Sequence, residues 1–127
     1  MTKLIMDVID NRYAVTAVLL FVTGLANMLL HQNLVRKVVA FNIMDSATFL
    51  FLASRGFVEG RAAAILTDGG ADITRYVNPI PAGLVLTGIV VSVSVSAFSL
   101  ALIQRIYVRY GTVELGELLE QTKKEKV

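Results

Sequence analysis

Residues 84–103 read LVLTGIVVSVSVSAFSLALI, a run of twenty residues without a charged side chain. The run lies within a longer uncharged stretch, because 29 residues separate Arg75 from Arg105. A bilayer core of about 30 Å takes about 20 helical residues, since each residue rises about 1.5 Å. The sequence therefore predicts a membrane-spanning helix over about residues 84–104.

Valine and serine alternate over residues 91–96, which by itself is typical of a strand. A lone strand cannot cross lipid, because its backbone N–H and C=O groups would have no partners there. In a helix, the same run places its small residues on one face, namely Gly88, Ser92, Ser96 and Ser99. We therefore predict a helix whose small-residue face packs against a neighbouring helix.

Two further apolar stretches precede this one, over residues 13–30 and 34–53. A short polar turn separates them, so the two helices should form an antiparallel pair. The second stretch reaches full membrane length only if Arg36 and Lys37, near its start, extend their side chains to the lipid headgroups. The sequence thus predicts three membrane-spanning helices.

The first of these segments has a second interpretation, as a cleaved signal peptide. The preceding residues 1–12 carry Asp7 and Asp10 and lack a strongly positive character. No small-residue cleavage site follows the apolar run. These features favour a retained helix.

Lysine and arginine counts predict the orientation. With three spans, the N-terminus and the loop over residues 54–79 share one side and carry five basic residues, whereas the other side carries seven. Because basic residues concentrate on the cytoplasmic side, we expect the N-terminus outside and the C-terminus inside. The expected location is the cytoplasmic membrane, with several passes.

The segments outside the spans are the loop over residues 54–79 and a tail over residues 105–127. In the loop, Ile65-Leu66-Thr67 and Ile73-Thr74 flank the turn Asp68-Gly69-Gly70, which is compatible with a small hairpin. In the tail, leucines oppose charged side chains, which predicts a short amphipathic helix. The whole chain, residues 1–127, is expected to form a single all-α membrane domain.

The composition excludes several classes of function. Hydrophobic residues make up 55% of the chain, and there is no cysteine. Disulfide frameworks, thiolate metal sites and cysteine nucleophiles are therefore excluded. The basic residues flank apolar segments and form no stripe with aromatics, so no nucleic-acid partner is expected. With no phosphate loop, zinc site or nucleophile–base pair, we expect no catalysis, metal or cofactor in this chain.

Asp45 is the only ionisable residue well inside a predicted span. A carboxylate at the bilayer centre costs about 2.5–3.5 kcal/mol, so it normally faces a partner or a water-filled cavity. Asn42 and Thr48 share a helical arc of about 120° with it. Two interpretations remain open: a proton- or sodium-carrying site, and a structural partner of a basic or hydroxyl group on an adjoining subunit.

Three residues at the membrane boundary are weaker candidates for an ion pathway. Arg36 and Lys37 are expected to anchor to headgroups, or one of them lines the mouth of an ion path. Lys37 is eight residues from Asp45, about 12 Å of helical rise, so a direct pair is not expected. His31 has no second metal ligand in reach and is a candidate for proton transfer only.

Residues 76–91 read YVNPIPAGLVLTGIVV. Through Asn78, Pro79, Pro81 and Thr87, this segment resembles the signature of the C-subunit family of Mrp-type multisubunit sodium/proton antiporters. The second span, which begins NLVRKVVAFNIM at residue 33, fits the same family. The family is also similar to the NuoK-type subunit of respiratory complex I. It further supplies the antiporter module of archaeal membrane-bound hydrogenase and sulfur-reductase complexes.

The chain departs from this pattern at two places. The NuoK branch has buried glutamates in its second and third helices, whereas this chain has Asn42 at the first position and no carboxylate in the third span. Ala82 replaces the signature glutamine after the second proline. These departures favour the antiporter branch over a complex-I-type proton relay.

The resemblance implies a NuoK-like, non-catalytic membrane subunit that helps to form a sodium or proton path. Its partners would be other integral membrane subunits, lipid and the transported Na⁺ or H⁺. The first alternative is the same type of subunit inside a redox-driven complex, such as a membrane-bound hydrogenase, a sulfur reductase or a complex I-like enzyme. The second alternative is an independent small homodimeric transporter.

Overall fold

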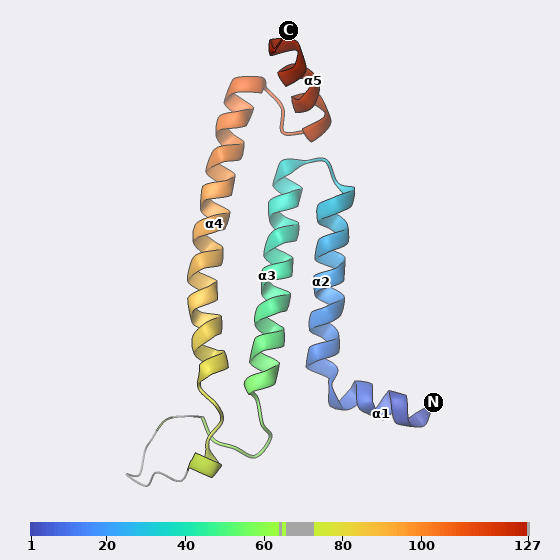
Figure 1. The fold of residues 1–127 in the computed structure, drawn as a ribbon, viewed down its shortest axis with the longest axis vertical. Helices are drawn as coiled ribbons and strands as arrows, with labels where there is room; N and C mark the ends of the chain where they lie inside the picture. The colour runs from blue at the N-terminus through green and yellow to red at the C-terminus, as the bar shows by residue number, and fades with distance from the viewer. Residues whose placement is uncertain (64, 66–72, 127) are drawn as a thin grey trace.

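The computed structural model describes residues 1–63, 65 and 73–126. Its elements are α1 (Thr2–Asp10), α2 (Arg12–Leu30), α3 (Leu34–Gly56), the short 3₁₀ helix η1 (Ile73–Arg75), α4 (Ile80–Tyr110) and α5 (Leu115–Glu125) (Figure 1). Helices α2, α3 and α4 are long and apolar enough to cross a membrane. Within the described residues there is no strand. The predicted all-α fold with three spans is therefore confirmed.

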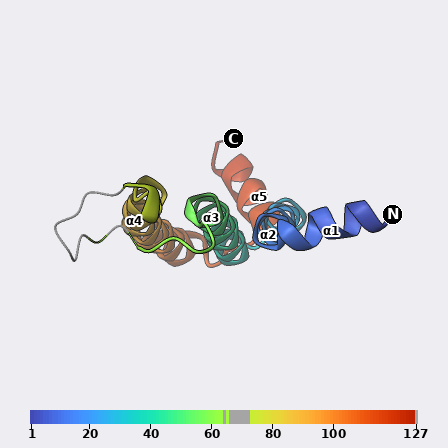
Figure 2. The same ribbon diagram turned by 90° about the horizontal axis from the view of Figure 1, so that it is seen from below.

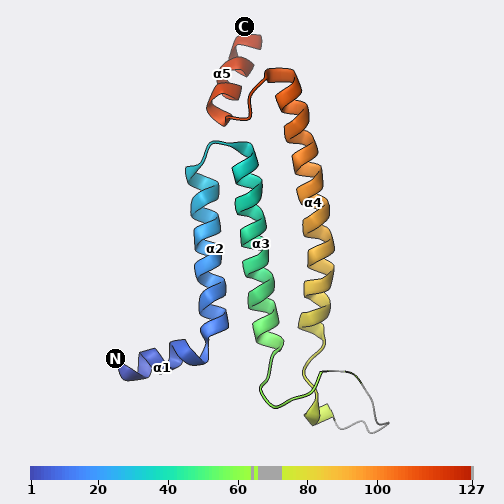
Figure 3. The same ribbon diagram turned by 180° about the vertical axis from the view of Figure 1, so that it is seen from behind.

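Helix α3 lies between α2 and α4, and it runs antiparallel to both (Figures 1 and 3). Seen from below, the three long helices stand almost in one row (Figure 2). The three spans therefore form a single layer, so α2 and α4 each keep a broad apolar surface on their outer sides. Many of their large apolar side chains are exposed, including Leu29 at 72% and Val90 at 67%.

Small residues set the packing of α2 against α3. The buried side chains of this interface belong to Ala17, Ala40 and Ala47. Gly24 is buried as well, and a Cβ added there would lie 3.1 Å from the Ala40 carbonyl oxygen. Because these side chains are so short, the two backbones approach closely.

The turn between α2 and α3 is polar and short, as expected. Asn33 precedes α3 in an extended conformation, and its Oδ1 accepts hydrogen bonds from the backbone N–H groups of Val35 at 3.0 Å and Arg36 at 3.3 Å. An asparagine in this position satisfies donors that the first helical turn leaves free. The side chain of Asn33 thus fixes where α3 begins.

Helix α4 begins at Ile80, four residues before the predicted start. Two prolines stand at this boundary, but Pro79 itself has helical angles and Pro81 lies in the first turn. A first turn tolerates proline because its N–H groups have no partner within the helix. Asn78 supports this start, since its Oδ1 accepts from the Ile80 N–H at 3.1 Å.

Most of the predicted hairpin lies outside the described residues. Its second arm, Ile73-Thr74, is described and is not a strand, because Ile73–Arg75 form η1. Next to it, Ala62 pairs with Tyr76 in an isolated parallel bridge. The Ala62 N–H donates to the Arg75 carbonyl at 2.8 Å, and the Val77 N–H donates to the Ala62 carbonyl at 3.0 Å. The start and the end of the loop between α3 and α4 are thereby joined.

Helix α5 is the predicted amphipathic helix, and it is held against the turn between α2 and α3. The Leu34 N–H donates to the Val113 carbonyl, and the Leu115 N–H donates to the Gln32 carbonyl, both at 3.0 Å. Between them, Asn33 Nδ2 donates to Glu114 Oε1 at 2.8 Å. The C-terminal segment thus caps the same end of the molecule at which α2 ends and α3 begins (Figure 1).

Helix α1 is an element that the apolar pattern did not predict. Its residues are exposed, and its axis turns away from that of α2 at Asn11 (Figure 1). The helix is amphipathic, with Leu4, Ile5, Val8 and Ile9 apart from its charged residues. Nine residues are too few to span a membrane, so the helix leaves no long apolar run in the sequence.

Candidate functional site

The contact between α3 and α4 follows a regular antiparallel register. Four pairs of residues touch along this contact. From one pair to the next, the position on α3 advances by three, four and seven residues, and the position on α4 goes back by four, four and seven residues. The matched pairs are Asn42 with Ser96, Asp45 with Ser92, Phe49 with Gly88 and Gly56 with Pro81. Gly88, Ser92 and Ser96 of α4 therefore face α3.

Asp45 meets α4 through a hydroxyl group. The Ser92 Oγ–H donates to Asp45 Oδ2 at 2.6 Å. Both side chains are half-buried between the two helices. A hydroxyl bonded to a carboxylate is a short, charge-assisted contact, which is stronger than a bond between neutral groups. The carboxylate of the second span thus finds a partner within this chain.

Asn42 forms the second polar contact, one turn away from Asp45. The Ser96 Oγ–H donates to Asn42 Oδ1 at 2.5 Å. Asn42, Asp45, Ser92 and Ser96 together form what we call the polar seam. Ser99, the last residue of the predicted small-residue face, is half-buried on α4 beyond Ser96. The seam lies in the middle of the layer, away from both ends of α3.

An apolar contact closes the seam on one side. The ring of Phe49 lies against Gly88, and a Cβ at position 88 would overlap its Cε1 atom. Gly56 and Pro81 also approach closely further on, because a Cβ at Gly56 would lie 2.9 Å from Pro81 Cβ. These pairs leave no signal in the sequence, although the spacing of Gly88 and Ser92 on the small-residue face pointed to a close approach.

Thr48 does not belong to the polar seam. Its Oγ1–H donates to the Met44 carbonyl of its own helix at 3.0 Å. The side chain lines a pocket of about 240 Å³ between α2 and α3, next to Ala17 and Ala47. The 120° arc predicted for Asn42, Asp45 and Thr48 is wide enough to face two different neighbours. One end of the arc therefore faces α4 and the other faces α2.

The side chains of Lys37 and His31 both contact backbone carbonyls at the end of α2. Lys37 Nζ donates to the Met28 carbonyl at 2.6 Å, and His31 Nδ1 lies 3.1 Å from the Asn27 carbonyl. Because a carbonyl only accepts, a hydrogen bond at this contact requires the tautomer with the hydrogen on Nδ1. A cation is favourable at the carbonyl end of a helix. These contacts cap α2 at the end of the layer, away from Asp45.

Several other polar residues in the spans bond to their own helices. Thr16, Thr23 and Thr87 donate to backbone carbonyls three or four residues earlier, at 2.8 to 3.1 Å. Asn27 does the same toward Thr23 at 2.9 Å. Each of these hydrogen bonds satisfies a polar side chain locally, within a single helix.

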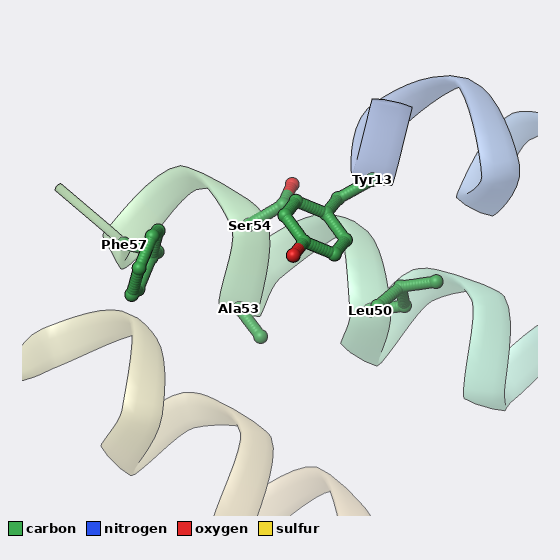
Figure 4. A pocket seen from close by; sticks show the side chains of 5 residues that line it. All are labelled: Tyr13, Leu50, Ala53, Ser54 and Phe57. Carbon is green, nitrogen blue, oxygen red and sulfur yellow. The ribbon is translucent and has the colours of Figure 1, made fainter. Parts of the chain in front are cut away.

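The other end of the layer holds an apolar pocket of about 220 Å³. It is lined by Tyr13 from the start of α2 and by four residues around the end of α3, Leu50, Ala53, Ser54 and Phe57 (Figure 4). Ser54 donates to the Phe51 carbonyl of its own helix at 2.7 Å. The lining of this pocket offers contacts to hydrocarbon and no charged group, so the polar seam is the better candidate for chemistry.

The sequence and the fold match known proteins. The model of the NADH-ubiquinone/plastoquinone oxidoreductase chain 4L family matches residues 12–121. The C1 subunit of the Na⁺/H⁺ antiporter of Staphylococcus saprophyticus is 35% identical over 99 residues, which covers 74% of this chain and 84% of the relative. The C1 subunit from Staphylococcus aureus is 32% identical over 100 residues, which covers 75% and 86%.

A solved structure shows the same arrangement of helices. A chain in the structure of the membrane-bound sulfane sulfur reductase, an archaeal respiratory membrane complex, superposes with a TM-score of 0.75. It is 36% identical in sequence, and the match covers 83% of this chain and 94% of that one. The likeness thus includes nearly all of the related chain.

Proposed function

Since this chain belongs to the NADH-ubiquinone/plastoquinone oxidoreductase chain 4L family, we propose that it is a membrane subunit of a multisubunit Na⁺/H⁺ antiporter-type complex. The matches reported above confirm the resemblance of residues 76–91 to the C-subunit family of Mrp-type antiporters. The subunit performs no catalysis on its own and helps to form the sodium or proton path. Homologues in an antiporter and in a respiratory membrane complex support this role.

The observation that assigns the ion path to particular residues is the half-buried pair of Asp45 and Ser92. A serine hydroxyl both donates and accepts hydrogen bonds. It therefore stabilises the ionised carboxylate as a donor and the protonated carboxyl as an acceptor. A carboxylate that keeps a partner in both states is suited to take up and release a proton, or to exchange it for Na⁺.

The arrangement of the helices in a single layer indicates that the chain needs partner subunits. Asp45 contacts α4 through Ser92, and the three described spans stand almost in a row, with no other span beside α3 (Figure 2). A carboxylate inside a membrane needs a more complete polar or watery surrounding. We infer that neighbouring membrane subunits supply the rest of the path.

A redox-driven parent complex is the second candidate, and the match to the sulfane sulfur reductase complex favours it. The chain has no cysteine, so it supplies no thiolate ligand to an iron–sulfur cluster. Its contribution is the same in both candidates, namely helix packing and part of an ion path. Genes for iron–sulfur subunits next to the gene for this chain would distinguish the redox-driven complex.

The test is the substitution Asp45→Asn in the assembled complex. We expect Na⁺/H⁺ exchange in proteoliposomes to fall by about a hundredfold, the lower range for loss of a proton-transfer group. Assembly should be unchanged, because asparagine still accepts from Ser92. Asp45→Glu should restore part of the activity, and Asp10→Asn, outside the spans, is the matched control.

Two results would contradict the assignment of Asp45. Unchanged exchange in the Asp45→Asn complex would remove this residue from the ion path. Loss of the assembled complex, seen by native gel electrophoresis, would show that Asp45 is a structural partner and not a carrier. In both cases the family membership of the chain would stand, since it does not depend on this residue.

A further inference from the structure

A groove of about 310 Å³ lies where α2 ends and α3 begins, near the end of the molecule that α5 caps (Figure 1). Its lining divides into two chemical halves. Asn27, His31 and Arg36 supply polar groups, and Val35, Val39 and Ile43 supply apolar side chains. Along α3, Arg36 comes before Val39 and Ile43, so its guanidinium group belongs to the start of the helix and these two apolar side chains lie further in.

The polar half carries an exposed cation. Among the described residues, no carboxylate pairs with the Arg36 guanidinium, whereas Arg109 at the same end pairs with Glu125 at 2.8 Å. Lys37 adds a second positive charge beside the groove, where it caps α2. Glu114 does not line the groove, and its carboxylate accepts from Asn33. The local charge is therefore positive.

The apolar half forms a stripe along α3. Val35, Val39 and Ile43 are spaced by four residues, so they lie on one face of the helix over about 12 Å of rise. Each is at least 36% exposed, and Val39 reaches 54%. Such a stripe has the length and the chemistry to contact part of an acyl chain.

From this arrangement we propose that the groove is a binding site for one anionic phospholipid. The Arg36 guanidinium holds the phosphate, and an acyl chain lies along Val35, Val39 and Ile43. Arginine suits this role because its planar fork binds two phosphate oxygens at once. The site lies at the level where a span meets the headgroups, on the end that charge counts predict to be cytoplasmic. The inference does not depend on which ion the complex carries.

The test uses the full chain in nanodiscs of phosphatidylcholine with either spin-labelled phosphatidylglycerol or spin-labelled phosphatidylcholine. We expect the wild-type chain to immobilise the anionic lipid about fivefold more strongly than the neutral one. Arg36→Gln should abolish this preference, and Arg36→Lys should keep part of it. The matched control is Arg105→Gln, which removes an exposed charge from α4 at the same end of the molecule. This variant should keep the preference.

Three results would overturn the proposal. The first is a wild-type chain that shows no preference for phosphatidylglycerol. The second is an equal loss of preference in Arg36→Gln and Arg105→Gln, which is the behaviour of diffuse surface charge. The third result is a preference that remains at its wild-type level in Arg36→Gln. Circular dichroism of each variant checks that the helices are retained, so that a lost preference reports on binding.

Discussion

At the scale of single residues, Gly24 shows how little space separates the helices. A Cβ at this position would lie 3.1 Å from the Ala40 carbonyl oxygen and 3.2 Å from the Met44 nitrogen. Both are backbone atoms of α3, which cannot swing aside as a side chain can. Gly83 differs, since a Cβ there would meet nothing within 4 Å. The two glycines therefore have different reasons to be where they are.

We predict that Gly24→Ala destabilises the α2–α3 pair by about 1–3 kcal/mol, the usual cost of overpacking a close contact. Gly83→Ala should be neutral, or stabilising by up to about 1 kcal/mol, because alanine is the better helix former. Denaturant unfolding of the purified chain in micelles, followed by circular dichroism, measures both. Equal stability of the two variants would show that the helices do not meet at Gly24 as described.

At the scale of elements, α5 is fixed at both of its ends. Its first residues bond to the turn between α2 and α3, and near its end Glu125 accepts from Arg109 at 2.8 Å and from the Tyr110 hydroxyl at 3.2 Å. The Arg109 guanidinium, followed by Tyr110, holds the pKa of Glu125 below its usual value of 4.5. The contribution is small, since both partners of this ion pair are exposed.

The sign of this pKa shift predicts how α5 responds to acid. A carboxyl whose folded pKa is lowered stabilises the folded state above its unfolded pKa, and this stabilisation is lost as the pH falls through the folded pKa. We therefore expect the end of α5 to loosen below about pH 4. A nitroxide on Gln121→Cys, read by electron paramagnetic resonance from pH 7 to pH 3, measures its mobility.

The control for this prediction is Glu125→Gln in the same labelled chain. Its label should be more mobile already at pH 7, and its change with pH should be smaller than in the parent. Identical pH profiles in the two chains would assign the response to another carboxylate, such as Glu114 or Glu117. No native cysteine competes for the label.

At the scale of the whole molecule, one layer of helices encloses very little. The buried apolar residues are few, namely Ala17, Ala40, Ala47, Ile103 and Leu118 among those that the structure describes. Large side chains such as Leu86 and Val108 are exposed at 68% and 79%. Lipid can cover these apolar surfaces, but it cannot complete the surroundings of Asp45. The shape of the molecule therefore agrees with a subunit that works inside a larger membrane complex.

We predict that the affinity-tagged chain, extracted in a mild detergent, is recovered together with other integral membrane subunits. Native mass spectrometry of the eluate gives the masses of the partners, and an extract from cells without the tag is the control. Recovery of the chain only as a homodimer, without other membrane subunits, would contradict the proposed function. That result would support the independent small transporter.

The spans were predictable because membrane helices are recognised by the absence of charge over some 20 residues. The start of α4 was not, since the same prolines that stop a helix elsewhere are tolerated in its first turn, as at Pro81. In the candidate site, the different directions of Asp45 and Thr48 depend on where α2 and α4 lie. Such tertiary placement leaves no local signal in the sequence, and neither does the cap that Lys37 forms on α2.

The contact between Phe49 and Gly88 decides which of two alignments the chain adopts. Serines at positions 92 and 96 are interchangeable as donors, so sliding α4 by four residues, about 6 Å, would bring Ser96 to Asp45 and satisfy the carboxylate equally well. The same displacement would set Ser92 against the ring of Phe49, where even a Cβ has no room. The Asp45 carboxylate alone would thus accept either alignment, and the absence of a side chain at position 88 favours the observed one.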